Sequence, residues 1–230
     1  MRRRSKLLAL FLLVAGVSAA AGAVVFVARR EPEFYTRAGA PADWETRERA
    51  ARLPTRLLDF KNEVRSKLVW GDTFTAAELN AFFAEHMCDR TGYGQALPEK
   101  LHAPRVAVDG DRVKVGFRYG RGFWSSVVWV EFKVWLVEGE TNLAALEVTE
   151  LRAGRLPLGT QSILDAVSEA AREWNIDVTW YRNDGNPVGL FKFFADQPIT
   201  PPTQVLTLEA ADGKITVAGR STLPGAPRAE

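Results

Sequence analysis

One cluster in the sequence could suggest a metal site: His86, Cys88, Asp89 and His102. Zinc is held in proteins by imidazole nitrogens and thiolates, usually four ligands at a time. Residues two apart on a helix point about 160° away from each other, so His86 and Cys88 cannot share one ion while a helix runs through them. We therefore predict no metal site, and for the same reason no Cys/His pair for nucleophilic catalysis.

Glu147 and Glu150 suggest paired carboxylates for acid–base chemistry, but the segment around them is predicted to be a strand. An odd separation along a strand places two side chains on opposite faces. The sequence also contains no GxSxG, HExxH, Walker or GxGxxG motif. We therefore predict a protein that is not an enzyme and that uses no cofactor.

The stretch FTAAELNAFFAEHMC, Phe74 to Cys88, is predicted to be a helix. Thr75 and Glu78 have the spacing of a capping box, in which each side chain accepts a hydrogen bond from the backbone N–H of the other residue. Asn80 falls between two apolar stripes of this helix. We therefore predict that Asn80 is buried and that its amide bonds to backbone groups at a sheet edge or in a loop.

Two sides of this helix are apolar, whereas an ordinary surface helix has one apolar stripe. The larger residues on one face are Leu79, Phe83 and Met87, and the second stripe consists of Ala77, Ala81, Ala84 and Cys88. The alanine stripe predicts the close approach of another helix or strand. The larger face predicts a broad apolar neighbour, which we expect to be the hollow of a curved sheet.

The longest predicted strand runs from Trp124 to Glu138. Successive side chains of a strand point to opposite faces, and the even positions form one apolar face with Val128, Val130, Phe132, Val134 and Leu136. The odd positions include Glu131 and Lys133 beside Trp129 and Trp135. We therefore predict that the even face is core and that the odd face is exposed to solvent, with two tryptophans on it.

Further alternating segments predict strands over residues 113–119, 142–152, 176–182, 187–194, 205–210 and 214–220. Turns of hairpin length, such as Asp109-Gly110-Asp111 and Glu138-Gly139-Glu140, join successive strands, so the sheet is predicted to be antiparallel. A second helix begins at Thr160 and has a single apolar face. The predicted fold is α+β, with a long curved antiparallel sheet packed on amphipathic helices.

The N-terminus has the pattern of a membrane anchor. MRRRSK precedes an uncharged run from Leu7 to Ala28, which as a helix would be about 33 Å long, enough to cross the hydrocarbon layer. The alternative is a cleaved signal peptide with Ala19-Ala20-Ala21 or Ala21-Gly22-Ala23 as the cleavage site. The run continues through Val24–Val27 to Arg29-Arg30, which favours an uncleaved anchor. The basic start predicts a cytoplasmic N-terminus and an extracytoplasmic C-terminal domain.

These segments define the predicted organisation. Residues 1–6 are a cytoplasmic start, residues 7–28 the transmembrane anchor and residues 29–43 a tether. Residues 44–69 form a charged amphipathic helical segment, residues 70–221 the extracytoplasmic α+β domain and residues 222–230 a disordered tail. The 230-residue chain is 47% hydrophobic with a net charge of +2, so it can bury a core, and it shows no basic footprint for nucleic acid.

Three stretches carry a family resemblance: FTAAELNAFF, LRAGRLPLGTQSILDAV and EAADGKITVAG. With the membrane run before them, they resemble the uncharacterised YpmS-type bacterial proteins, and more loosely the tubular lipid-binding and AsmA-like envelope proteins. In Gly154-x-Leu156-Pro157-Leu158, Gly159 stands where we expect a second proline. The resemblance, over roughly residues 70–221, implies a lipid- or envelope-associated module outside the bacterial cytoplasmic (inner) membrane. It implies no catalytic residues.

We expect one of two functions. The first is binding of a lipid or other long apolar ligand between helix and sheet, at a site lined by Leu79, Phe83, Met87, Val128, Val130, Phe132 and Val134. The alternative is a structural or scaffolding envelope protein with a filled core, which docks a protein partner through Trp129 and Trp135. A continuous apolar cavity of about 300 Å³ or more would favour ligand binding.

Overall fold

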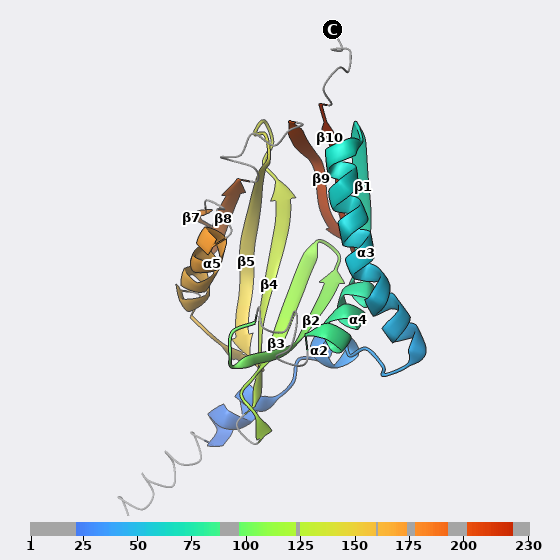
Figure 1. Cartoon of the computed structure of the whole chain (residues 1–230). Coiled ribbons are helices and arrows are strands. Elements are labelled where there is room, and N and C mark those ends of the chain that lie inside the picture. The colour runs from blue at the N-terminus through green and yellow to red at the C-terminus, as the bar shows by residue number, and fades with distance from the viewer. Residues whose placement is uncertain are drawn as a thin grey trace, which may run out of the picture.

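A computed structural model of the chain describes residues 22–87, 97–122, 125–159, 161–173, 178–192 and 202–222. Over these residues the fold is α+β with two antiparallel sheets (Figure 1). The labelled helices are α2 (Glu33–Arg37), α3 (Trp44–Ser66), α4 (Ala76–His86) and α5 (Gln161–Glu173). The strands are β1 (Val69–Thr75), β2 (Leu101–Asp109), β3 (Arg112–Tyr119), β4 (Ser126–Leu136), β5 (Leu143–Ala153), β6 (Leu156–Pro157), β7 (Val178–Asn183), β8 (Asn186–Lys192), β9 (Thr203–Ala211) and β10 (Lys214–Ser221).

The larger sheet has the strand order β2-β3-β4-β5-β8-β7, and the short β6 pairs with β5. Every pair is antiparallel, so the prediction of a large antiparallel sheet is confirmed. In the turn between β7 and β8, Asp184 and Gly185 have φ values of 48° and 87°. Two consecutive positive φ angles define the tight hairpin turn that favours Asp-Gly.

The smaller sheet has the order β1-β10-β9. The predicted last hairpin forms β9 and β10, whereas β1 was not predicted from the sequence. The indole N–H of Trp70 in β1 donates to Ser221 Oγ at 2.9 Å. The rings of Trp70 and Phe74 both contact Phe60 of α3 edge-on, so aromatic packing holds α3 against this sheet.

The charged helical segment predicted for residues 44–69 forms α3, which continues through Pro54. Arg56 of α3 pairs with two carboxylates, Asp72 of β1 at 2.5 Å and Glu78 of α4. One guanidinium therefore joins α3 both to the smaller sheet and to α4.

The helix α2 lies inside the segment predicted to be a tether (residues 29–43). Its residues Phe34 and Tyr35 are buried against Val127 and Trp129 of β4, and the ring centroids of Phe34 and Trp129 are 5.4 Å apart. The predictions of a simple tether and of a solvent-exposed odd face of β4 are therefore wrong in this region. The reason is that α2 supplies an apolar cover for that face.

Residues 22–29 are helical and meet one end of the larger sheet, where the backbone N–H of Arg155 donates to the carbonyl of Val27 at 3.2 Å. Among the described residues no helix is both long enough and apolar enough to cross a membrane. Most of the predicted anchor, residues 7–21, lies outside the described residues, as do residues 223–230 of the predicted tail.

Candidate ligand-binding face

The capping box predicted at the start of α4 is confirmed. The N–H of Glu78 donates to Thr75 Oγ1 at 3.1 Å, and the N–H of Thr75 donates to the Glu78 carboxylate at 2.9 Å. The N–H of Ala76 donates to the carbonyl of Gly213 in the β9–β10 turn at 2.8 Å. Burial alone would raise the pKa of Glu78, but the hydrogen bonds from Thr75 and the charge of Arg56 hold it below its usual value. The start of α4 is therefore fixed to α3 and to the smaller sheet.

Asn80 binds the outer edge of β2, which the smaller sheet does not pair. The Asn80 amide donates to the carbonyl of Val106 at 2.7 Å and accepts from the N–H of Val106 at 2.8 Å. Asn80 is 7% exposed. Both parts of the prediction, burial and bonding to backbone at a sheet edge, are confirmed. The amide replaces a neighbouring strand at this one position and sets α4 along β2.

The two apolar sides of α4 have different neighbours. Leu79 and Phe83 pack on the cluster that contains Val106 of β2. Ala81 is completely buried and α3 lies against α4, which agrees with the predicted close neighbour, whereas Ala77 is exposed. The helix lies along the β2 edge of the sheet rather than across its middle.

One face of the larger sheet is apolar from β2 to β8. The register places Val106 opposite Val115, Val115 opposite Val130, and Val130 opposite Leu151, and residues opposite each other share a face. We call this the apolar face. Its larger side chains are Val106, Val108, Val113, Val115, Phe117, Val128, Val130, Phe132, Val134, Leu136, Leu146, Val148, Leu151 and Phe191.

All seven residues predicted to line a ligand site belong to this face or to α4 above it, and all seven are only half-buried: Leu79, Phe83, Met87, Val128, Val130, Phe132 and Val134. On the opposite face of the same strand, Val127 is 1% exposed and Trp129 is 9% exposed. As far as Lys133, β4 has a paired strand on each side, so its place in the sheet does not explain the half-burial of Val128, Val130 and Phe132. Along Val128–Val134 the apolar face is therefore less covered than the face beneath α2, whereas Val113, Val148 and Leu151 on the same face are buried.

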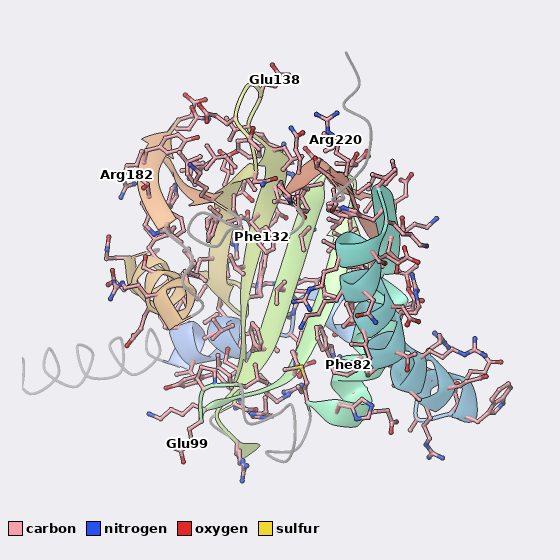
Figure 2. The ribbon with its side chains drawn as sticks, turned by 45° about the horizontal axis from the view of Figure 1, so that its top comes forward. Phe82, Glu99, Phe132, Glu138, Arg182 and Arg220 are labelled. Carbon is pink, nitrogen blue, oxygen red and sulfur yellow. The ribbon has the colours of Figure 1, made fainter. Side chains whose placement is uncertain are left out.

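Elements at both edges cover part of the apolar face. Ala210 of β9 packs with Val106 beside α4. At the other edge, the indole N–H of Trp180 in β7 donates to Ser168 Oγ of α5 at 2.8 Å, and Leu164 of α5 is buried. In Figure 2, Phe132 lies between α5 on one side and α3 with α4 on the other. The half-buried part of the face therefore lies between two flanking walls.

The opposite face of β4 contains a buried carboxylate. Glu131 is 5% exposed. It accepts hydrogen bonds from Arg112 at 2.5 Å and from Thr149 Oγ1 at 2.9 Å, and Lys114 Nζ lies 3.4 Å away. Burial alone would raise the pKa of Glu131, but these three partners together hold it below its usual value.

Replacing Glu131 with Gln is expected to lower the free energy of unfolding at pH 7 by about 1–3 kcal/mol, the range for losing hydrogen bonds to a buried charged group. The folded-state pKa is below the unfolded value of about 4.3. The carboxylate therefore stabilises the fold above that value, and its contribution is lost as the pH falls through the folded pKa. Urea unfolding at pH 7 and pH 3 measures the difference in unfolding free energy between the wild type and the variant, with Glu138→Gln in an exposed turn as the control. An equal difference at both pH values would contradict a stabilising role of the Glu131 charge.

A cleft of about 430 Å³ opens in another place, between the α2–α3 connection, the start of α4 and β2. Its walls combine cationic and apolar side chains, among them Arg37, Arg49, Lys114, Ala76 and Val108. None of the seven predicted lining residues borders this cleft. It is therefore not the apolar cavity that the sequence analysis required for ligand binding.

The residues considered for metal binding have other surroundings. Among the described residues, no group of three or more His, Cys, Asp or Glu side chains could hold a metal ion. The ring of His86 lies 5.0 Å from that of Phe82. Burial, and then the charges of Arg118 and Arg121, lower the pKa of His102. Cys88 and Asp89 lie outside the described residues.

The prediction for Glu147 and Glu150 is wrong in its geometry. The register places Glu147 opposite Lys133 and Glu150 opposite Glu131, so both lie on one face. The reason is a β-bulge in this pairing, which shifts the alternation by one residue. The two carboxylates have separate partners, Asn186 for Glu147 and Arg152 for Glu150.

Asn142 has a structural role that was not predicted from the sequence. It lies in the β4–β5 turn with φ of 58°. Its amide donates to the carbonyl of Thr203 and accepts from the N–H of Val205, both at 2.8 Å. Asn142 thus binds the edge of β9 as Asn80 binds the edge of β2. A Thr-Asn pair in a turn gives only the local conformation, because β9 is about sixty residues further along the chain.

Comparison with known proteins found no match to this chain among protein-family models, curated proteins or solved structures.

Proposed function

We propose that this chain is a membrane-anchored extracytoplasmic module that binds a lipid or other long apolar molecule along the apolar face, between α4 and β4. The observation that supports this function best is the half-burial of Val128, Val130, Phe132 and Val134 on a central strand. In a filled core these side chains would be covered as completely as Val127 is on the other face.

The shape of the exposed surface favours a long ligand. Alternate residues of one strand are about 6–7 Å apart, so Val128 to Val134 form a row about 20 Å long. This row lies between α4 on one side and α5 on the other, and β9 lies against β4 itself. An acyl chain lying along the row would cover apolar surface, which is favourable by about 25 cal/mol per Å².

Charged side chains are absent from the described part of this row and are concentrated on the opposite face, where Glu131 and Lys133 alternate with it. A polar or ionic ligand would find no partners along the row. The proposed site therefore favours ligands with a large apolar area. The headgroup of a lipid would have to lie beyond the row.

The membrane placement rests on the sequence of residues 7–28 and on the resemblance to YpmS-type and tubular lipid-binding proteins. The scaffolding alternative relied on Trp129 and Trp135 as a docking surface. Trp129 is buried beneath α2, which leaves that surface with one of its two tryptophans.

The test compares two tryptophan substitutions on the two faces of β4. Val130→Trp is expected to fill volume that the ligand uses, so bound lipid falls several-fold while the melting temperature changes little. Val127→Trp on the covered face is expected to destabilise by about 1–3 kcal/mol through overpacking. The full-length proteins are purified from membranes in mild detergent. Lipid is measured by native mass spectrometry, and stability by thermal unfolding.

The outcomes separate the two functions. Lipid on the wild type that Val130→Trp loses without loss of stability supports the proposal. Equal lipid on both proteins means that the lipid is held elsewhere, including around the anchor, and contradicts it. A wild type without lipid, together with strong destabilisation by Val130→Trp, indicates a filled core and a scaffolding role.

A further inference from the structure

The end of the predicted anchor is fixed to one end of the larger sheet. Ser126 Oγ, at the start of β4, donates to the carbonyl of Ala28. Gly154, just after β5, has φ of 57°, and a Cβ atom there would lie 2.3 Å from the same carbonyl oxygen. With the bond from Arg155 to Val27, these contacts leave no free linker between residue 28 and the sheet.

The register shows which residues lie at this end. Leu101 is opposite Tyr119, Tyr119 is opposite Ser126, and the next row of β4 places Val128 opposite Ala153. The connections before β2, after β3 and after β5 therefore all emerge beside Ala28. Figure 1 shows the N-terminal helix reaching the sheet at this end, away from the β4–β5 turn.

The exposed charges at this end are mainly positive. Arg29 and Arg30 follow the apolar run directly, and the three connections add Lys100, Arg121 and Arg155. We call these five residues the basic end. The acidic side chains nearby are Glu31, which pairs with Arg118 at 2.5 Å, and Glu99.

We propose that the basic end lies against the membrane surface and binds the headgroups of anionic phospholipids, so that the strands of the apolar face rise away from the bilayer. This inference rests on the membrane anchor of the proposed function. It is independent of whether the apolar face holds a ligand.

Several observations support this partner. The chain's own apolar run ends at this surface, and the tight junction at Gly154 brings the bilayer surface to the sheet end. Anionic lipids attract clustered Lys and Arg within about 10 Å of the surface. Tyr119 is exposed in the same row of the sheet, and tyrosine is enriched at membrane–water interfaces. The low pKa of His102, caused by burial and by Arg118 and Arg121, is consistent with a positive potential here.

The experiment measures hydrogen–deuterium exchange of the full-length chain in nanodiscs of phosphatidylcholine, with and without phosphatidylglycerol. We expect the backbone amides of residues 97–102 and 118–122 to exchange roughly fivefold more slowly with phosphatidylglycerol, the factor that corresponds to about one basic residue at an anionic surface. The amides of the β4–β5 turn are expected to be unchanged.

Two triple variants with the same change in net charge provide the comparison. Lys100→Glu, Arg121→Glu and Arg155→Glu reverse the basic end and are expected to abolish the lipid-dependent protection. Arg182→Glu, Lys192→Glu and Arg220→Glu reverse exposed charges away from it and are expected to keep the protection; Figure 2 labels Arg182 and Arg220 at the end opposite Glu99. Melting temperatures close to that of the wild type show that both variants are folded.

Failure of the anchor and failure of the basic end give different results. A chain that does not enter phosphatidylcholine nanodiscs lacks the anchor, and flotation with phosphatidylglycerol vesicles then tests the basic end alone. A chain that enters them but exchanges equally with both lipids, or equally in the two triple variants, overturns the inference.

Discussion

Replacing Trp129 with Ala is expected to lower the free energy of unfolding by about 3–5 kcal/mol, the usual cost of truncating a large buried aromatic side chain. Trp129 is 9% exposed. Its ring packs against Phe34 of α2, and its indole N–H donates to the carbonyl of Gly154 at 2.8 Å. The substitution removes both the packing under α2 and a buried hydrogen bond. Urea unfolding followed by circular dichroism measures the change.

Trp135→Ala is the matched control on the same face of the same strand. Trp135 is 37% exposed, so its truncation is expected to cost less than about 1 kcal/mol. Equal and small effects for the two tryptophans would show that α2 does not cover β4. Trp129 would then belong to the exposed docking surface expected from the sequence.

Trp129 and Trp135 show which features of a strand the alternation of apolar and polar residues can predict and which it cannot. The pattern placed β4 within two residues of its observed ends and separated its two faces correctly. The pattern could not predict which face is covered, because the covering helix α2 comes from another part of the chain. Phe34 and Tyr35 form a short apolar pair between charged residues, and five helical residues have too little periodicity to be recognised.

Local signals predicted the start of α4 and the turn at Asp109-Gly110-Asp111, because the interacting groups are close in sequence. The strand β1 was missed because Gly71 and Asp72 interrupt its apolar alternation, and its partner β10 is about 140 residues away. The pairing of β5 with β8 joins residues about forty to fifty positions apart, which is also beyond the reach of local signals. The half-burial of the apolar face depends on the positions of α4, α5 and β9, which no single segment specifies.

Replacing Asn80 with Leu is expected to lower the free energy of unfolding by about 2–4 kcal/mol. The variant leaves both the N–H and the carbonyl of Val106 without their amide partner in a buried place, and each unsatisfied group costs about 1–3 kcal/mol. Leucine is similar in size and is a good helix former, so the loss of α4 itself would not account for the effect. Urea unfolding measures it, with Glu85→Leu at an exposed site of the same helix as the control.

The comparison of these two leucine variants also tests how α4 is held on the sheet. If the bonds of Asn80 to Val106 fix α4 along β2, the destabilised Asn80→Leu protein should show faster hydrogen exchange at the N–H of Val106 than at Val113, which lies within the β2–β3 ladder. Glu85→Leu should change neither rate. Equal stability of the two variants would show that water reaches the edge of β2 and satisfies Val106. In that case the packing of Leu79 and Phe83, together with the contacts at the start of α4, would hold the helix above the apolar face.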